Sequence, residues 1–558
     1  MYTKKIGSIL LLIKFIGLIT FIISDLCAAG KNIDIEIDSL ITLNKENPNQ
    51  GYSNKAFTKL EIKKNRAIQK VLFDCLPDDS LKNLIARYNY LYAKKTALED
   101  SSKYYIDKID SLKKQVIRDY PQYAYFMLAH NPVTVKEVQQ KYLREKQALL
   151  NFSVSENRIH VFFITKDTFQ VVSYHINRDE LSQKLVELLA PIYRAKNPLY
   201  LNFDLKLAHQ LYNQIFAPVE KLFGNEESII IIPDDIFLGF PFECLVAQLN
   251  FEQNDNKTIL YEEYAAATFL IHKYAVSYNF STLALNPKFQ AIHSHKKLGR
   301  KLLTVSELTG LEHENDTTGI GWNLQSPAYG KEQVTRVSRL LWRHKNLTEE
   351  EATEDYLKNN CFDFRWIYLA IPGMLNNETP NLSALMFSSS FSSLQDNRLY
   401  ISEVINCNLR ADLITLSGCE LKPFQVEKKL GVIGIPQSFL LSGVQSVMFS
   451  LWRIHDETIC RFMSKFYWEL KYKRQTNSLA LQQAKLSSID DTFKYKGREI
   501  SKAHPYFWAP YILIGNVNVR PPTFSTIPPR MVILIMYVIV LTVSMIIVRK
   551  TVDKNSKK

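Results

Sequence analysis

The fold is decided by one stretch of sequence, Ala411-Asp412-Leu413-Ile414-Thr415-Leu416-Ser417-Gly418-Cys419-Glu420. Its first six residues are typical of a short buried strand, and its last four form a turn that contains a glycine. In an α/β fold, such a turn exposes a side chain in the crevice outside the carboxyl end of the strand. Cys419 is therefore a candidate nucleophile, and a buried structural thiol is the alternative interpretation.

A cysteine nucleophile also needs a proton acceptor nearby. The acceptor is expected at the end of a second buried strand, Arg365–Ala370, which continues into Ile371-Pro372-Gly373. No histidine stands there, and proline cannot act as a base. His455 and His504 are the substitute candidates, and His455 is preferred because it follows the strand that ends at Trp452. A structural or surface histidine is the alternative for both.

Strands and helices alternate along the chain. Buried-strand patterns occupy Ile229–Ile232, Trp366–Ala370, Leu413–Leu416, Val444–Leu451 and Tyr511–Ile514. Helical patterns occupy Arg178–Leu189, Asp204–Phe216, Glu350–Lys358, Val432–Leu441 and Asp456–Tyr472. The alternation predicts an α/β fold with a mostly parallel sheet flanked by helices. Before the first of these strands, the apolar residues of 59–149 have helical spacing, and a helix is expected over Thr134–Leu149.

The first residues are typical of an export signal. Lys4 and Lys5 precede an apolar run, and Cys27-Ala28-Ala29 offers small residues for cleavage. A signal peptide is therefore predicted over residues 1–29. An uncleaved anchor is the alternative, while a lipoprotein site at Cys27 is disfavoured by the bulky Leu26 before it.

Near the other end, the segment from Met531 to Val548 carries no charge and would span about 27 Å as a helix. Positive charges dominate residues 549–558, so the positive-inside rule places this tail in the cytoplasm. We therefore expect a single-pass membrane protein with its transmembrane helix over 531–548 and most of the chain outside the cytoplasm. A buried core helix is the alternative for this segment.

Composition argues against several classes of function. The formal charge is +13 on 558 residues, but part of it lies in the two ends and the other lysines are spread through helical stretches. We therefore expect no nucleic-acid binding. The seven cysteines form no CxxC pair, and no glycine loop is typical of a phosphate site, so neither a metal nor a cofactor is expected.

Several blocks of sequence carry a resemblance to a known family. In order, they are Ile231–Glu243 with its Pro-Asp-Asp turn and Pro-Phe-Glu segment, Ala352-Thr353-Glu354, Ser417-Gly418-Cys419-Glu420, Ser450-Leu451-Trp452 and His504–Pro510. Together they resemble the CHAT family, caspase-like domains usually found with tetratricopeptide repeats and related in fold to caspases and separase. The resemblance covers about residues 145–517, although the repeats themselves are not evident before it.

The resemblance implies a cysteine–histidine dyad in which Cys419 is the nucleophile. The family's histidine stands in a His-Gly pair after its strand, and Pro372 occupies that position here. Leu430 stands where the family usually has an acidic residue that could help to read a basic substrate side chain. Both departures indicate a membrane-anchored, catalytically impaired domain that acts in protein or peptide binding or in scaffolding. An active cysteine peptidase with a substitute histidine is the alternative.

These patterns predict a caspase-like α/β fold in two subdomains. The expected segments are a signal peptide (1–29), a helical run-in region (30–145), a first α/β subdomain (146–285), a linker or loop (286–330), a caspase-like subdomain (331–519), the transmembrane helix (531–548) and a cytoplasmic basic tail (549–558).

Overall fold

The fold is taken from a computed structural model of the chain, which describes residues 33–519 and 529–555 with internal gaps. The gaps are residues 75, 77–78, 98–102, 121–122, 125–126, 129–131, 196, 251–258, 286–301, 307–329, 342, 375, 377–381, 388–396, 408 and 419–433. The predicted signal peptide over residues 1–29 lies outside the described residues.

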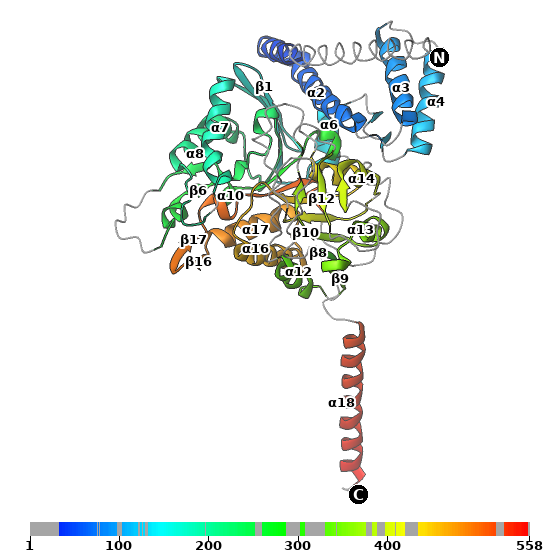
Figure 1. Ribbon diagram of the computed structural model, residues 1–558, viewed down its shortest axis with the longest axis vertical. Coiled ribbons are helices and arrows are strands. Elements are labelled where there is room, and N and C mark those ends of the chain that lie inside the picture. The colour runs from blue at the N-terminus through cyan, green and yellow to red at the C-terminus, as the bar shows by residue number, and fades with distance from the viewer. Residues whose placement is uncertain are drawn as a thin grey trace, which may run out of the picture.

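Helices precede the sheet in the chain. They are a helix over residues 33–46, α2 (Tyr52–Asp74), α3 (Asp79–Ala97) and α4 (Lys103–Asp119). In Figure 1 they lie above the α/β body.

The helix predicted over Thr134–Leu149 is wrong in its second half. The helical turns are α6 (Val135–Glu137) and η2 (Val138–Tyr142). They end at Tyr142, and the strand β1 (Gln147–Val154) follows. Leu149 pairs with Ile164 of β2 on one side and with Ile230 of β4 on the other. Pairing between segments far apart in the sequence therefore overrides the local helical spacing.

One sheet of eleven strands forms the centre of the molecule, in the order β3-β2-β1-β4-β7-β18-β15-β14-β10-β8-β9. Their bounds are β1 as above, β2 (Arg158–Ile164), β3 (Phe169–His175), β4 (Ser228–Ile232), β7 (Ala275–Tyr278), β8 (Leu302–Ser306), β9 (His344–Thr348), β10 (Trp366–Ala370), β14 (Leu413–Leu416), β15 (Ser446–Ser450) and β18 (Tyr511–Gly515). The predicted α/β fold with a mostly parallel sheet is confirmed.

Nine strands of the sheet form two parallel blocks that run in opposite directions, while β2 and β3 extend the first block in the antiparallel sense. Strands β1, β4, β7 and β18 are parallel to one another, and so are β15, β14, β10, β8 and β9. The blocks meet where β15 and β18 pair in the antiparallel sense, with Ser450 opposite Tyr511. The carboxyl ends of the first block therefore lie at the opposite edge of the sheet from those of the second.

Helices cover both faces of the sheet. On β2, Phe162 contacts Phe57 of α2 while its neighbour Phe163 contacts Phe223 on the other face, since successive strand residues point to opposite sides. The helices are α7 (Arg178–Tyr193), α8 (Leu205–Leu211), α9 (Ala217–Glu220), α10 (Leu270–Lys273), α12 (Gly330–Arg339), α13 (Glu354–Asn360), α14 (Ile401–Asn406), α15 (Ile435–Leu441), α16 (Asp456–Trp468) and α17 (Asn477–Ile489). Figure 1 shows α12, α16 and α17 side by side over one face.

Three small sheets complete the described fold. They are β11 (Gly373–Met374) with β12 (Ala384–Met386) and β13 (Arg398–Tyr400), β16 (Thr492–Tyr495) with β17 (Arg498–Ser501), and β5 (Val246–Gln248) with β6 (Thr268–Phe269). The first of these begins directly after Pro372, so it lies at the edge where the candidate site is expected.

The last described helix, α18 (Pro529–Asn555), extends away from the α/β body (Figure 1). Within the described part of the chain, no helix meets the length and apolarity needed to cross a membrane. This finding contradicts the predicted single-pass membrane localisation.

Candidate functional site

Two neighbouring parallel strands, β10 and β14, carry the candidate site at their carboxyl ends. Their register places Tyr368 opposite Thr415 and Leu369 opposite Leu416. The ladder continues one residue further, because the Ser417 N–H donates to the Leu369 carbonyl at 3.0 Å. The turns that leave the two strands therefore start side by side, as the sequence predicts.

The two turns are in backbone contact. A Cβ placed on Gly418 would stand 2.4 Å from the carbonyl oxygen of Ile371 and 2.9 Å from its nitrogen. Only a residue without a side chain fits at this distance. The absence of a side chain at Gly418 therefore allows the two backbones to approach each other. The start of the cysteine turn lies against Ile371, the residue that precedes Pro372.

Pro372 is buried at this junction. Its carbonyl accepts the N–H of Met386 at 3.0 Å, which anchors β12 of the small sheet beside it. A proline has no backbone N–H, and its saturated ring has no atom that can take up a proton. The position next to the cysteine turn is therefore chemically inert as a base.

Two residues singled out in the sequence, Cys419 and Leu430, lie outside the described residues. The described chain reaches Gly418 and resumes at Gly434, which precedes α15. The role of Cys419 as the nucleophile stays a prediction.

His455 stands at the start of α16, just after β15. Its carbonyl accepts the N–H and the hydroxyl of Thr458, at 3.0 and 2.6 Å. Its ring lies against Phe493 and Tyr495 of β16, with centroids 5.7 and 5.0 Å apart. The imidazole is thus placed beside the β16–β17 hairpin, and its use as a substitute base stays a prediction.

His504 is fully buried in an aromatic surrounding. Its ring centroid lies 4.5 Å from that of Tyr264 and 5.0 Å from that of Tyr261. Its Nδ1 accepts the Tyr506 N–H at 3.1 Å, so the proton of the neutral ring sits on Nε2. Burial lowers the pKa of His504 to about 3. With its one lone pair occupied, His504 is a packing residue and not a base.

Gln333 of α12 belongs to the site, and sequence reasoning missed it. Its Oε1 accepts the hydroxyl protons of Tyr368 at 2.8 Å and of Ser417 at 3.1 Å. Burial raises the pKa of Tyr368 well above its usual range, so its hydroxyl stays a donor. The available signal was helical spacing, since Gln333 shares the buried face of α12 with Val334 and Val337.

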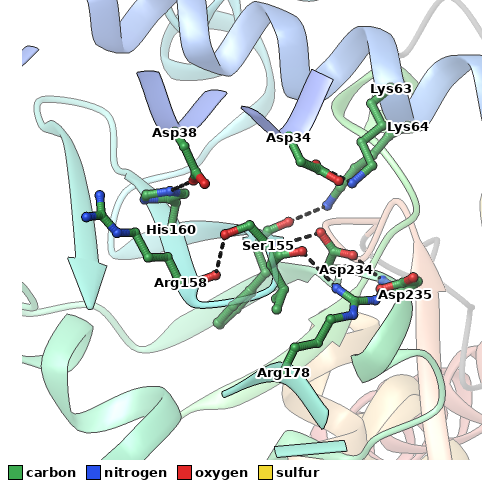
Figure 2. A network of polar contacts seen from close by, with 12 residues as sticks. Asp34, Asp38, Lys63, Lys64, Ser155, Arg158, His160, Arg178, Asp234 and Asp235 are labelled. Carbon is green, nitrogen blue, oxygen red and sulfur yellow. Dashed lines mark hydrogen bonds and ion pairs between the residues drawn. The ribbon is translucent and has the colours of Figure 1, made fainter. Parts of the chain in front are cut away.

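A second polar cluster lies at the opposite edge of the sheet, where β1 and β4 end (Figure 2). The ammonium group of Lys64 from α2 donates to the Asn151 side chain at 2.7 Å and to the carbonyls of Phe152, Ile232 and Pro233 at 2.9–3.1 Å. Burial lowers the pKa of Lys64 to about 8. Helix α2 therefore supplies the ammonium group that binds the acceptors at the carboxyl ends of β1 and β4.

The Pro-Asp-Asp turn after β4 completes this cluster (Figure 2). Asp234 accepts the Val154 N–H at 2.9 Å, and Asp235 pairs with Arg178 of α7 at 2.5 Å. Lys63 pairs with Asp34 of the preceding helix at 2.6 Å. These contacts join elements of the fold to one another, which explains the turn as a structural motif.

No group of three or more histidine, cysteine or acidic side chains is placed to hold a metal ion in the part of the chain that the structure describes.

Comparison with protein families identifies this arrangement. Residues 205–516 match the CHAT domain. The chain belongs to the CHAT domain family. The matched residues begin at α8 and end after β18, so they include β10, β14 and Pro372. The resemblance found in the sequence is confirmed, while comparison with curated proteins found no match.

Solved structures share a distant likeness with this CHAT protein. Two structures of the Saccharomyces cerevisiae separase–securin complex are 8% and 12% identical, cover 86% and 83% of this chain and 37% of their own, and have TM-scores of 0.40 and 0.41. A complex of the pro- and mature domains of Porphyromonas gingivalis RgpB is 9% identical, with coverages of 62% and 77% and a TM-score of 0.33. The chain spans little more than a third of the separase chains, so the family match alone carries the identification.

Proposed function

We propose that this CHAT-domain protein does not cleave peptides and that it binds a protein or peptide segment at the carboxyl ends of β10 and β14. One observation carries the proposal: the position that holds the family's histidine is occupied by Pro372, directly after the residue that contacts Gly418. Fold alone does not decide function, so the argument rests on this site.

The chemistry of a cysteine–histidine dyad explains why this replacement matters. The imidazole takes the thiol proton, and the thiolate then attacks the peptide carbonyl. Without the imidazole the thiol keeps its proton, and loss of a general base lowers the rate by a factor of about 10²–10⁴. Two observations support the proposal: His504 has no available lone pair, and the ring of His455 lies against the β16–β17 hairpin.

The second departure concerns recognition. Leu430 stands where the family usually has an acidic residue, and a leucine cannot pair with a basic side chain. A partner would therefore be selected by apolar contact and by backbone hydrogen bonds rather than by a basic residue. Together with Pro372, the leucine at position 430 favours a site that binds a partner over a site that cleaves it.

The proposal is tested by comparing the full chain with Pro372→His and with Cys419→Ala. A mixture of fluorogenic peptides and a thiol-directed activity probe would be applied to each variant at neutral pH. We expect the wild type to match Cys419→Ala, and Pro372→His to gain probe labelling that disappears when Cys419 is also replaced. Turnover or labelling of the wild type that depends on Cys419 would contradict the proposal and favour an active peptidase with another base.

A further inference from the structure

Three buried residues from three different elements meet beneath the candidate site. They are Gln333 of α12, Tyr368 of β10 and Ser417 just after β14, and these residues are 1%, 0% and 9% exposed. A single atom joins them, since Oε1 of Gln333 accepts both hydroxyl protons. The cluster links a strand of the site, the turn beside it and a covering helix.

The amide of Gln333 is used on one side only. Its Nε2 is buried and, within the described residues, has no hydrogen-bond partner. An orphaned buried donor is destabilising, so an apolar residue of similar size would serve packing better. What the amide supplies is the acceptor that orients the hydroxyls of Tyr368 and Ser417.

Ser417 is consequently held at two points. Its N–H is bonded to the Leu369 carbonyl at 3.0 Å, and its hydroxyl is bonded to Gln333 at 3.1 Å. The next residue, Gly418, lies in contact with the backbone of Ile371. The path of the chain out of β14 is therefore fixed by β10 on one side and by α12 on the other.

We propose that Gln333 is a positioning residue that sets the conformation of the Ser417–Gly418 turn and so shapes the docking site between β10 and β14. This inference rests on the proposed function for its meaning, but the geometry of the turn can be tested by itself. Loss of the acceptor removes the hydrogen bond that joins the Ser417 hydroxyl to α12 and loosens the turn, while the rest of the sheet keeps its hydrogen bonds.

The test is amide hydrogen exchange of the full chain, followed by mass spectrometry. Gln333→Met keeps the volume and removes the acceptor, whereas Gln333→Glu keeps an acceptor oxygen. Gln482→Met is the matched control, because Gln482 is a buried glutamine of α17 that donates to the Ile271 carbonyl at 2.9 Å, away from this turn.

We expect Gln333→Met to speed exchange in the peptide that contains residues 413–418 by about fivefold, the factor that follows from losing one net hydrogen bond. In Gln333→Met, exchange in β1 and β4 should stay unchanged. Gln333→Glu should keep the wild-type exchange rate in the 413–418 peptide, and so should Gln482→Met. Equal exchange of that peptide in wild type and Gln333→Met would overturn the inference.

Should Gln333→Met fail to fold, Ser417→Ala removes the same hydrogen bond from the other side with the loss of one oxygen atom. It should produce the same local increase in exchange, and an unchanged rate would again overturn the inference. The readout does not depend on Cys419 chemistry. A peptidase activity in the wild type would therefore defeat the proposed function without deciding the role of Gln333.

Discussion

Gly418 lies against Ile371 so closely that a Cβ on the glycine would stand 2.4 Å from the Ile371 carbonyl oxygen. The contact joins the turn that leads to Cys419 with the turn that carries Pro372. It places the position of the missing histidine next to the cysteine turn, and it makes the site sensitive to the smallest change in side-chain volume.

Gly418→Ala should therefore destabilise the protein by about 2 kcal/mol or more, because backbone atoms cannot rotate away as a side chain would. Gly224→Ala is the matched control, since its nearest neighbour would be a flexible glutamate oxygen at 3.8 Å. Denaturant unfolding of both variants measures the difference. Equal stability of the two would show that the turns separate at little cost.

A buried ion pair joins the helical turn Phe242–Cys244, which follows β4 in the chain, to α17. Lys485 and Glu243 are 0% and 1% exposed, with the ammonium nitrogen 2.8 Å from the carboxylate oxygen, and Tyr278 donates its hydroxyl to the same carboxylate. Lys485→Met should lower the free energy of unfolding by about 3–5 kcal/mol, because it leaves a buried charge without its partner.

The double variant Lys485→Met with Glu243→Gln should be more stable than Lys485→Met alone, since the amide oxygen still accepts from Tyr278 and no charge remains. A double-mutant cycle in denaturant measures this recovery. Additive losses would show that the charge of Glu243 is not the source of the damage.

The helical region should be held to the sheet by Lys64 more than by its neighbour Lys63. Lys64 reaches four acceptors at the ends of β1 and β4, whereas Lys63 forms one partly exposed ion pair with Asp34 (Figure 2). We expect Lys64→Met to destabilise by about 2 kcal/mol and Lys63→Met by less than about 1 kcal/mol. Limited proteolysis within α2 would report the order, and the reverse order would refute it.

The buried His504 should make the free energy of unfolding depend on pH. Its pKa is near 6.5 when the chain is unfolded and about 3 in the fold, so between these values the unfolded state binds one more proton. The free energy of unfolding should fall as the pH drops below 6.5, with a contribution of up to about 1.4 kcal/mol per pH unit. Above that pH the group contributes no slope.

The matching variant is His504→Asn, which keeps an acceptor for the Tyr506 N–H and removes the titrating ring. Denaturant unfolding from about pH 4 to pH 8 should give a smaller slope for the variant than for the wild type. Identical slopes would mean that His504 binds its proton in the folded state as readily as in the unfolded one.

The strands of the site could be predicted from sequence because they are short apolar runs bounded by turn residues. The bounds expected for β10 and β14, Trp366–Ala370 and Leu413–Leu416, are those of the structure. Their adjacency also followed, because the carboxyl ends of parallel strands share an edge.

Elements stabilised by distant partners could not be predicted. Strand β8 lies in the segment 286–330 that the sequence indicates as a linker, and it is ordered by β10 and β9 on its two sides. Helix α17 buries polar residues such as Asn477, Gln482 and Lys485, so it shows no apolar stripe. Gln333 was missed for a related reason, since its partners come from β10 and from the turn after β14.

The central claim is that no proton acceptor serves the cysteine turn, and the most direct measurement is the alkylation rate of Cys419 at neutral pH. Iodoacetamide would be applied to the full chain, with Cys419→Ala as background and free glutathione as the unactivated reference. The account predicts that Cys419 reacts no faster than glutathione. Selective alkylation about thirtyfold faster, as expected for a thiol ionised at neutral pH, would contradict it.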